Sequence, residues 1–194
     1  MATIADIGIA SSYPGILQPK LKNRWRATFT NIGHLTDSRV LTAQCTKIER
    51  PKLEFEEVEL HRYNSRAWIG SKHSWSEMPI TIEDDVTSGA TSVIQAQVQM
   101  QQWLIGAQGP WLAAAPEGSV YKFGTKIELL DGGVNVLEVW NVEGCWIKSV
   151  EYGELAFEEP GKMEISLSIR FDHAYQVILP YTTGPGSALG GPEY

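Results

Sequence analysis

The sequence has few cysteines, an excess of acidic over basic residues and no CxxC pair. Cys45 and Cys145 are its two cysteines among 194 residues. We interpret them as two buried thiols in a reducing compartment, with a disulfide or a nucleophilic cysteine as the alternatives. The 16 basic residues against 23 acidic ones argue against tight nucleic-acid binding, because such binding depends on neutralising phosphates with Lys and Arg.

Long hydrophobic runs are also missing. The most apolar stretch, 103–115, is interrupted by Gly106, Gly109 and Pro110, whereas a membrane-spanning helix needs roughly 20 consecutive apolar residues. The first six residues have neither the basic start nor the apolar core of a secretory signal. At 43% hydrophobic residues, the chain is too apolar for intrinsic disorder. We expect a soluble protein without membrane insertion that stays where it is made.

Motifs for catalysis, cofactors and metals are missing as well. There is no HExxH, no GxSxG, no phosphate-binding glycine loop and no Rossmann fingerprint. The histidines lack the spacing of metal ligands; they are His34, His61, His73 and His173. Asp172-His173 lies beside no candidate nucleophile, and Glu83-Asp84-Asp85 suits a helix start better than a weak calcium site. We predict no enzyme, no cofactor and no metal.

What the sequence does contain is alternation with a period of two. Three segments show it: 25–29, 121–129 and 163–171. In each, apolar residues alternate with polar or charged ones, as in a strand with one face in a core and the other in water. Asp131-Gly132-Gly133 predicts a hairpin turn into the run 134–142, because glycine tolerates the positive φ of tight turns. These patterns predict a mainly β fold of antiparallel strands.

One segment, 88–107, predicts a helix. Val93, Ala96, Met100 and Trp103 fall on one helical face. Glutamines also alternate with apolar residues here, as in a strand, but about 20 residues is long for a strand and normal for a helix. Gly109-Pro110 is a plausible stop.

A bulged hairpin is predicted between residues 53 and 69. The apolar residues change their phase of alternation between Phe55 and Val58, so an inserted residue near Glu56-Glu57 would form a β-bulge and bend the strand. Asn64-Ser65 offers a turn, and the segment 66–69 can return as the partner strand.

The hairpin is rich in charge. Its candidate site residues are Glu54, Glu56, Glu57, Glu59, Arg62 and Arg66. One interpretation is a solvated hairpin with cross-strand ion pairs, each contributing less than about 1 kcal/mol. The other is a hairpin that projects and pairs with a neighbouring subunit. Spacing alone favours the first interpretation.

The two ends of the chain differ from its middle. Residues 1–23 have few periodic features, and residues 180–194 contain the Gly/Pro-rich segments 184–186 and 190–192. We predict an amino-terminal arm over 1–23, a β domain over 24–179 and a flexible tail over 180–194.

Tryptophans raise an alternative function. Six of them could form a sugar-stacking surface: Trp68, Trp75, Trp103, Trp111, Trp140 and Trp146. In an alternating β protein they more often belong to the core or to a subunit interface. A carbohydrate-binding β-sandwich therefore stays a less favoured alternative.

Several tracts together resemble the tail tube proteins of contractile-tailed bacteriophages. They are 45–51, the bulged hairpin, 75–85 with its Trp75 and acidic end, 139–147, and the strand 163–171 followed by Asp172-His173-Ala174. The resemblance covers roughly residues 24 to 175, and its specificity lies in the order of the tracts. The amino arm and the carboxyl tail lie outside the common pattern.

The resemblance implies two packed antiparallel sheets flanked by a helix, with the hairpin projecting. It further implies hexameric rings whose inner strands join into one β-barrel, stacked into a tube inside a contractile sheath, with sheath, baseplate and tail terminator proteins as partners. Such a tube belongs to the virion, is assembled in the host cytoplasm and conducts double-stranded DNA into the host without binding it specifically. The alternative is the tube of a bacterial contractile injection or secretion system. We expect the hairpin carboxylates to face the lumen or a subunit interface, since an acidic lumen repels phosphate.

Overall fold

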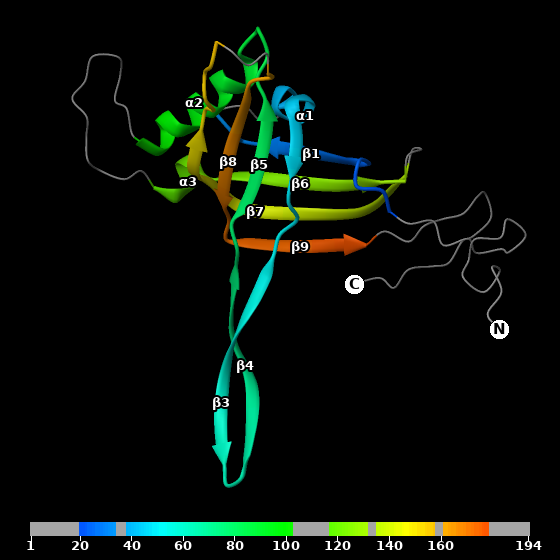
Figure 1. The fold of residues 1–194 in the computed structure, drawn as a ribbon, viewed down its shortest axis with the longest axis vertical. Helices are drawn as coiled ribbons and strands as arrows, with labels where there is room; N and C mark the ends of the chain where they lie inside the picture. The colour runs from blue at the N-terminus through cyan, green and yellow to red at the C-terminus, as the bar shows by residue number, and fades with distance from the viewer. Residues whose placement is uncertain (1–19, 34–37, 103–116, 132–134, 158–160, 179–194) are drawn as a thin grey trace, which may run out of the picture.

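The computed structural model describes residues 20–33, 38–102, 117–131, 135–157 and 161–178 (Figure 1). The elements are β1 (Trp25–Thr30), α1 (Arg39–Gln44), β2 (Cys45–Ile48), β3 (Leu53–Arg62), β4 (Ser65–Trp75), β5 (Met78–Glu83), α2 (Gly89–Gln102), α3 (Gly118–Tyr121), β6 (Phe123–Leu130), β7 (Val136–Glu151), β8 (Glu164–Arg170) and β9 (His173–Ile178). The prediction of a mainly β fold is confirmed.

Two groups of antiparallel strands share the long strand β7. Its first part pairs with β6 and β9, and β6 pairs with β1; its last part pairs with β8, which continues through β5 to β2. Figure 1 shows the strands of one group crossing those of the other. The expected arrangement of two packed sheets is thus confirmed, and β7 connects them.

β7 passes from the first strand group to the second at Gly144. This glycine has a φ of 69°, and an added Cβ would lie 2.3 Å from the Oδ2 atom of Asp172. A side chain there would therefore be both strained and obstructed. Glycine lets one strand leave the first group at Cys145, opposite Phe123, and join the second at Trp146.

The core lies between the two strand groups and α2. β1 contributes Ala27 and Phe29, and β8 contributes Ile165, Leu167 and Ile169, all as the alternation predicts. The segment 121–129 starts later than predicted. Tyr121 belongs to α3, where backbone hydrogen bonds such as Lys122 N to Gly118 O (3.0 Å) close a helical turn.

α2 confirms the predicted helix over residues 89–102, while 103–107 lie outside the described residues. Its buried face consists of Ala90, Val93, Ile94 and Gln97, so the predicted face shares only Val93 with it. Gln97 is buried because its side chain accepts a hydrogen bond from Gly33 N (2.9 Å) and donates one to Tyr121 O (2.5 Å). The prediction missed this because a hydrophobic pattern ignores buried amides.

The hairpin β3–β4 projects far from the body of the molecule (Figure 1). Its register shifts between Phe55 and Glu57, at the position along the hairpin where the bulge was predicted. The prediction of an inserted residue at Glu56-Glu57 is wrong, because the additional residue lies on β4, between Gly70 and His73. The turn is Tyr63-Asn64, one residue earlier than expected, with Arg62 opposite Ser65. β4 also runs six residues beyond the predicted end at residue 69, to Trp75.

The arm 1–23, apart from its last four residues, the tail 180–194 and the turn at Gly132-Gly133 lie outside the described residues, so their predicted roles stay predictions. Among the described helices, none has the length and apolar character to cross a membrane.

Candidate assembly interfaces

The strand group β1-β6-β7-β9 ends in two unpaired edges. In the described chain β1 pairs with no strand other than β6, and β9 pairs with no strand other than β7. The β1 edge is occupied at its Phe29 end, because Ser38 N donates a hydrogen bond to Phe29 O at 3.2 Å. Because all three pairings in this group are antiparallel, β1 and β9 run in opposite directions. An unpaired edge offers backbone N–H and C=O groups to another chain. The β9 edge of one copy can therefore lie beside the β1 edge of the next and preserve the antiparallel alternation.

The β9 edge also carries exposed apolar side chains. Tyr175, Val177 and Ile178 are all exposed. The ring of Tyr175 stacks on that of His173, with centroids 6.1 Å apart. Such a row of large side chains on an edge strand is typical of a surface that another chain covers.

The face of this group that points away from the core carries a charge cluster on β1 and β6, and Val139, Tyr175 and Val177 on β7 and β9. Glu128 lies opposite Arg26, whose Nε donates to Glu128 Oε2 at 2.8 Å, and Lys126 Nζ lies 2.7 Å from Glu128 Oε1. Burial tends to raise the pKa of Glu128, but hydrogen bonds from Lys126 and Arg26 outweigh it, and the net pKa is lowered. The carboxylate is thus held ionised between two bases.

The six predicted site residues all lie on the projecting hairpin. Glu54, Glu56 and Glu57 are exposed on β3, near the body, and Arg62 and Arg66 are exposed near the turn. Glu54 pairs with Lys52, and Glu59 pairs with Arg66 at 3.1 Å. Both expected features are therefore present, the cross-strand ion pair and the projection. Their contact with a neighbouring subunit stays a prediction.

Sequence reasoning missed the apolar surface of the hairpin. Phe55, Val58, Trp68 and Ile69 are all exposed, with Trp68 at 57%. The signal is present in the sequence as the apolar triplet Ala67-Trp68-Ile69 within a charged segment.

Sequence reasoning also missed Glu138, a buried carboxylate on β7. Its side chain is 2% exposed, and it accepts hydrogen bonds from Lys20 Nζ and Trp140 Nε1, both at 2.5 Å. Arg50 Nη1 lies 3.7 Å away. Burial tends to raise the pKa of Glu138, yet the hydrogen bonds from Lys20 and Trp140 lower it overall. This cluster ties the start of the described chain and the base of the hairpin to the β-sheet.

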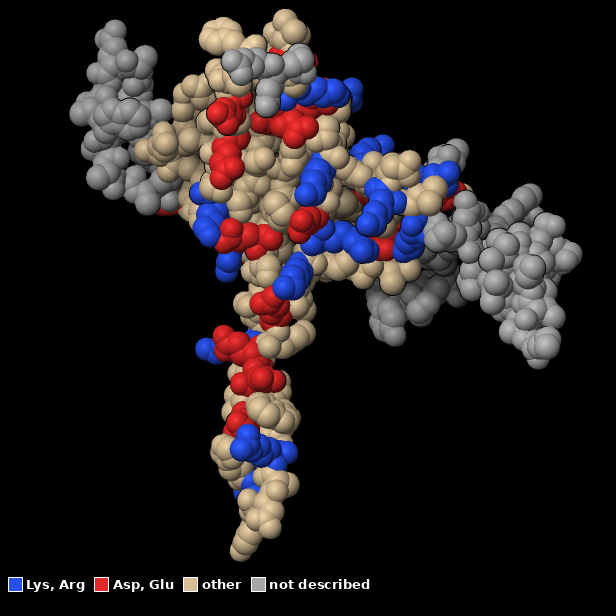
Figure 2. Space-filling model, in the orientation of Figure 1, with Lys and Arg blue, Asp and Glu red and all other residues tan. Residues whose placement is uncertain are grey.

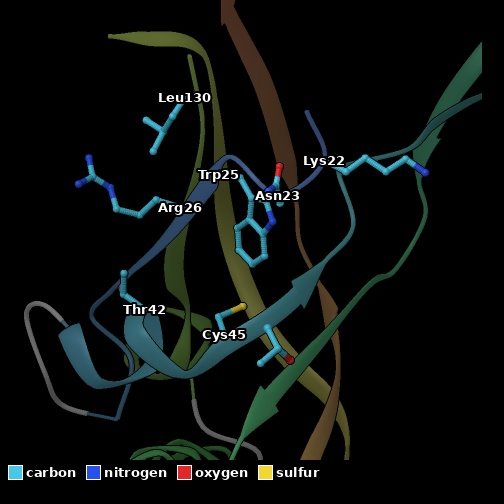
Figure 3. Close-up of a pocket in the computed structure, with 8 residues that line it drawn as sticks. Lys22, Asn23, Trp25, Arg26, Thr42, Cys45 and Leu130 are labelled. Atoms are coloured by element: carbon cyan, nitrogen blue, oxygen red, sulfur yellow. The ribbon is translucent and has the colours of Figure 1, made fainter. Parts of the chain in front are cut away.

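A shallow cavity of about 710 Å³ lies between β1 and the α1–β2 segment. Figure 3 shows Trp25 and Cys45 at this site, with Arg26 and Lys22 pointing away in opposite directions. Burial raises the pKa of the Cys45 thiol to about 12 and that of Cys145 to about 11. Both cysteines are free, so the disulfide alternative is wrong, and the raised pKa values argue against a nucleophilic thiolate.

The described residues contain no group of three or more His, Cys, Asp or Glu side chains that could hold a metal. Asp172 pairs with Lys122 at 2.5 Å, and the ring of His173 lies edge-on to Trp75. The Asp172-His173 pair thus makes structural contacts at the start of β9. Among the tryptophans of the described ranges, Trp68 is the one that is exposed, which does not favour a sugar-stacking surface.

Known proteins match this chain in their solved structures and not in their sequences. No family model matches the sequence, and no curated protein matches it. The anti-feeding prophage baseplate contains a chain with a TM-score of 0.61 at 12% identity, covering 82% of this chain and 96% of that one. The tube-terminating cap of the same prophage gives 0.59 at 15% identity, covering 92% and 100%. The chain has the tail-tube fold.

A third neighbour comes from the sheath–tube complex of an extracellular contractile injection system, PVC, in its extended state. Its TM-score is 0.57 at 9% identity, covering 92% of this chain and all of that one. The tail-tube fold therefore spans nearly the whole length of these neighbours, and the resemblance found in the sequence is confirmed at the level of the fold.

Proposed function

We propose that this protein is the structural subunit of the tube in a contractile tail, and that it has no enzymatic activity. Copies join edge to edge into a hexameric ring, and rings stack into a tube. The observation that carries the proposal is the pair of free edges: β1 and β9 run in opposite directions at the two ends of one four-strand group. The number six is taken from the baseplate neighbour, which is six-fold symmetrised.

A cyclic ring of this kind removes every free edge from the strand group. Each β9 pairs with the β1 of the next copy, so no strand is left to template aggregation. The contact is head-to-tail, since it joins two different edges. Such contacts form a closed ring when the rotation from one copy to the next is a whole fraction of 360°. Six copies supply more strands than the roughly 16–18 that enclose an aqueous channel. The face with the charge cluster Arg26, Lys126 and Glu128 would line that channel.

For the hairpin carboxylates, we propose a subunit interface in preference to the lumen. They lie on the projecting hairpin, away from the strand group that would form the barrel (Figure 2). The exposed apolar residues beside them, such as Phe55 and Val58, support burial against another copy.

The proposed setting is a phage virion, assembled in the host cytoplasm, with sheath, baseplate and terminator proteins as partners and double-stranded DNA as the cargo. The acidic balance of the chain, a formal net charge of -7, supports a conduit that does not retain phosphate. The second candidate is the tube of a contractile injection system, which the anti-feeding prophage and PVC neighbours favour. A DNA-filled head on the particles that carry this protein would support the first, and headless particles the second.

Disulfide trapping tests the ring. Thr28→Cys on β1 is combined in turn with His173→Cys, Tyr175→Cys or Val177→Cys on β9, because the register across the boundary is unknown. One of the three pairs should give, after oxidation of concentrated protein, a ladder of covalent oligomers that ends at six. The wild type, with Cys45 and Cys145 only, and Thr28→Cys alone are the controls, and neither should exceed a dimer. A ladder from none of the three pairs would overturn the proposed ring.

A further inference from the structure

A groove of about 600 Å³ lies between the start of β1 and the end of β2. Its floor is apolar and consists of Trp25, Ile48 and Leu129, which are half-buried and pack against the edge of the core. The volume is within the range of pockets that bind small ligands, so the groove has room for large side chains of a partner. We call it the Trp25 groove.

Bases surround the apolar floor. Among the described residues that line the groove, the bases are Lys20, Lys22, Arg24, Lys47 and Arg50, and the one acid is Glu49. Lys20 and Arg50 are paired with Glu138. Lys22 and Lys47 are exposed, and neither has a partner among the described residues. Figure 2 shows basic side chains gathered over the right-hand side of the body. A chain with a formal net charge of -7 thus has a local basic surface, and its partner should be acidic and apolar.

The Trp25 groove is compatible with the proposed ring. Trp25 lies opposite Leu129 in the pairing of β1 with β6, and the next pair is Arg26 with Glu128. Because successive residues of a strand point to opposite faces, the groove lies on the face away from the proposed channel. Closing the ring through the strand edges would therefore leave the groove open to a partner.

The segment that follows β7 has the complementary composition. Residues 151–157 are all exposed. Among them, Tyr152, Leu155 and Phe157 are large and apolar, and Phe157 is fully exposed. Glu151 and Glu154 have no ion pair among the described residues. Large apolar side chains that remain exposed together are typical of a surface that a partner buries. We call 151–157 the acidic loop.

The acidic loop and the Trp25 groove lie apart within one molecule. In Figure 1 the loop lies near the top, by the start of β8, whereas β1 starts at the right-hand side of the body. The groove that the loop of one copy fills is therefore that of another copy.

We propose that the acidic loop of one copy docks in the Trp25 groove of a second copy. Leu155 and Phe157 would pack on Trp25, and the two carboxylates of the loop would lie beside Lys22 and Lys47. The two surfaces differ, so the contact is head-to-tail. The inference goes beyond the proposed ring, because this contact uses neither the strand edges nor the hairpin.

A peptide tests the contact without requiring a ring. A fluorescently labelled peptide with the sequence of residues 150–157 is titrated with the full-length protein, and binding is followed by fluorescence anisotropy. Lys22→Glu combined with Lys47→Glu should weaken binding by about tenfold or more, because like charges in an interface oppose association. Arg62→Glu combined with Lys72→Glu makes the same change in net charge on the hairpin. It is the matched control and should stay within about twofold of the wild type.

A second peptide tests the apolar part of the contact. Phe157→Ala in the peptide should weaken binding to the wild-type protein by about tenfold or more, because the ring would no longer be buried on the groove floor.

Photo-crosslinking of the full chain identifies the surface that the loop contacts. With p-benzoylphenylalanine in place of Phe157, irradiation of concentrated protein should give covalent dimers. Mass spectrometry should map their crosslinks to residues 20–26 or 46–50. The same group in place of Tyr63, at the hairpin turn, is the control and should not label these residues.

Four results would overturn the inference. They are no binding of the peptide, equal losses in the two double variants, an unchanged affinity of the Phe157→Ala peptide, and crosslinks from position 157 that fall within one chain or outside the groove. None of them affects the disulfide ladder between β1 and β9, so failure of this contact and failure of the proposed ring are distinguishable.

Discussion

The body and the hairpin use the same kinds of residue for different purposes. Phe29 and Phe55 both lie on β-strands, yet Phe29 is 1% exposed and Phe55 is 66% exposed. In the body, apolar residues from both strand groups and α2 form one core. In the hairpin, β3 and β4 pair only with each other among the described strands, so there is no second layer to bury them.

The core that stabilises the monomer and the hairpin that would contact another copy in the proposed tube are therefore separate parts of the molecule. A two-stranded hairpin is marginally stable in water by itself, so its ten- and eleven-residue strands gain little from their own contacts. In the proposed tube, another copy would bury its exposed apolar and charged side chains. Mutations in the body should therefore change the folding of the monomer, and mutations in the hairpin should change assembly.

The largest expected effect is the difference in the free energy of unfolding between two variants, Phe29→Ala and Phe55→Ala. Phe29→Ala should lower the free energy of unfolding by about 3–5 kcal/mol, because it removes a fully buried ring and leaves a cavity. Phe55→Ala, the matched control, should lower it by less than about 1 kcal/mol. Urea titration of the monomer measures both. Similar losses for the two variants would contradict the division between body and hairpin.

An intermediate effect is expected at Glu138, where the body meets the base of the hairpin. Glu138→Gln should lower stability at neutral pH by about 1–3 kcal/mol, because Lys20 and Trp140 lose a charged acceptor. Thermal unfolding across a pH series measures it.

The pH series also has an expected sign. The pKa of Glu138 is lowered in the folded protein from the ordinary value of 4.5, so its contribution is fully present above pH 4.5 and is lost as the pH falls through the folded pKa. Glu138→Gln should therefore flatten the loss of stability in acid. An equally steep acid limb in the variant would contradict the ionised, hydrogen-bonded carboxylate.

The smallest expected effect is on the hairpin ion pair. A double-mutant cycle with Glu59→Gln and Arg66→Gln should give a coupling energy of about 0.5 kcal/mol or less in the monomer, because Arg66 is largely exposed. A coupling energy above about 1 kcal/mol would show that the hairpin is stabilised by its own contacts.

Local patterns predicted much of the fold. The alternation in β1, β6 and β8 identified their buried faces, because a strand with one wet face must alternate with a period of two. The phase change near Glu56-Glu57 located the bulge. The helical face of α2 was misplaced, because Gln97 is buried through hydrogen bonds to Gly33 and Tyr121, and both partners are far away in the sequence.

The candidate site was predicted in part. The charged residues of the hairpin were found from composition, and their projection was one of two interpretations. Glu138 and the exposed apolar residues of the loops were not found. Val86 and Phe157 are exposed apolar residues in loops, and a sequence by itself does not distinguish such residues from buried ones.

Sequence patterns were sufficient to predict β1, β6, β8, the helix α2 and the charged, bulged hairpin, because these depend on neighbours a few residues apart. They did not predict β2, β9, α1 or α3. Contacts in the folded chain were needed to show which strands lie at the edges, that β7 pairs in both strand groups and that Glu138 is buried beside Lys20 and Trp140. These features depend on contacts between residues that are distant in the chain, and such contacts leave no periodic signal in the sequence.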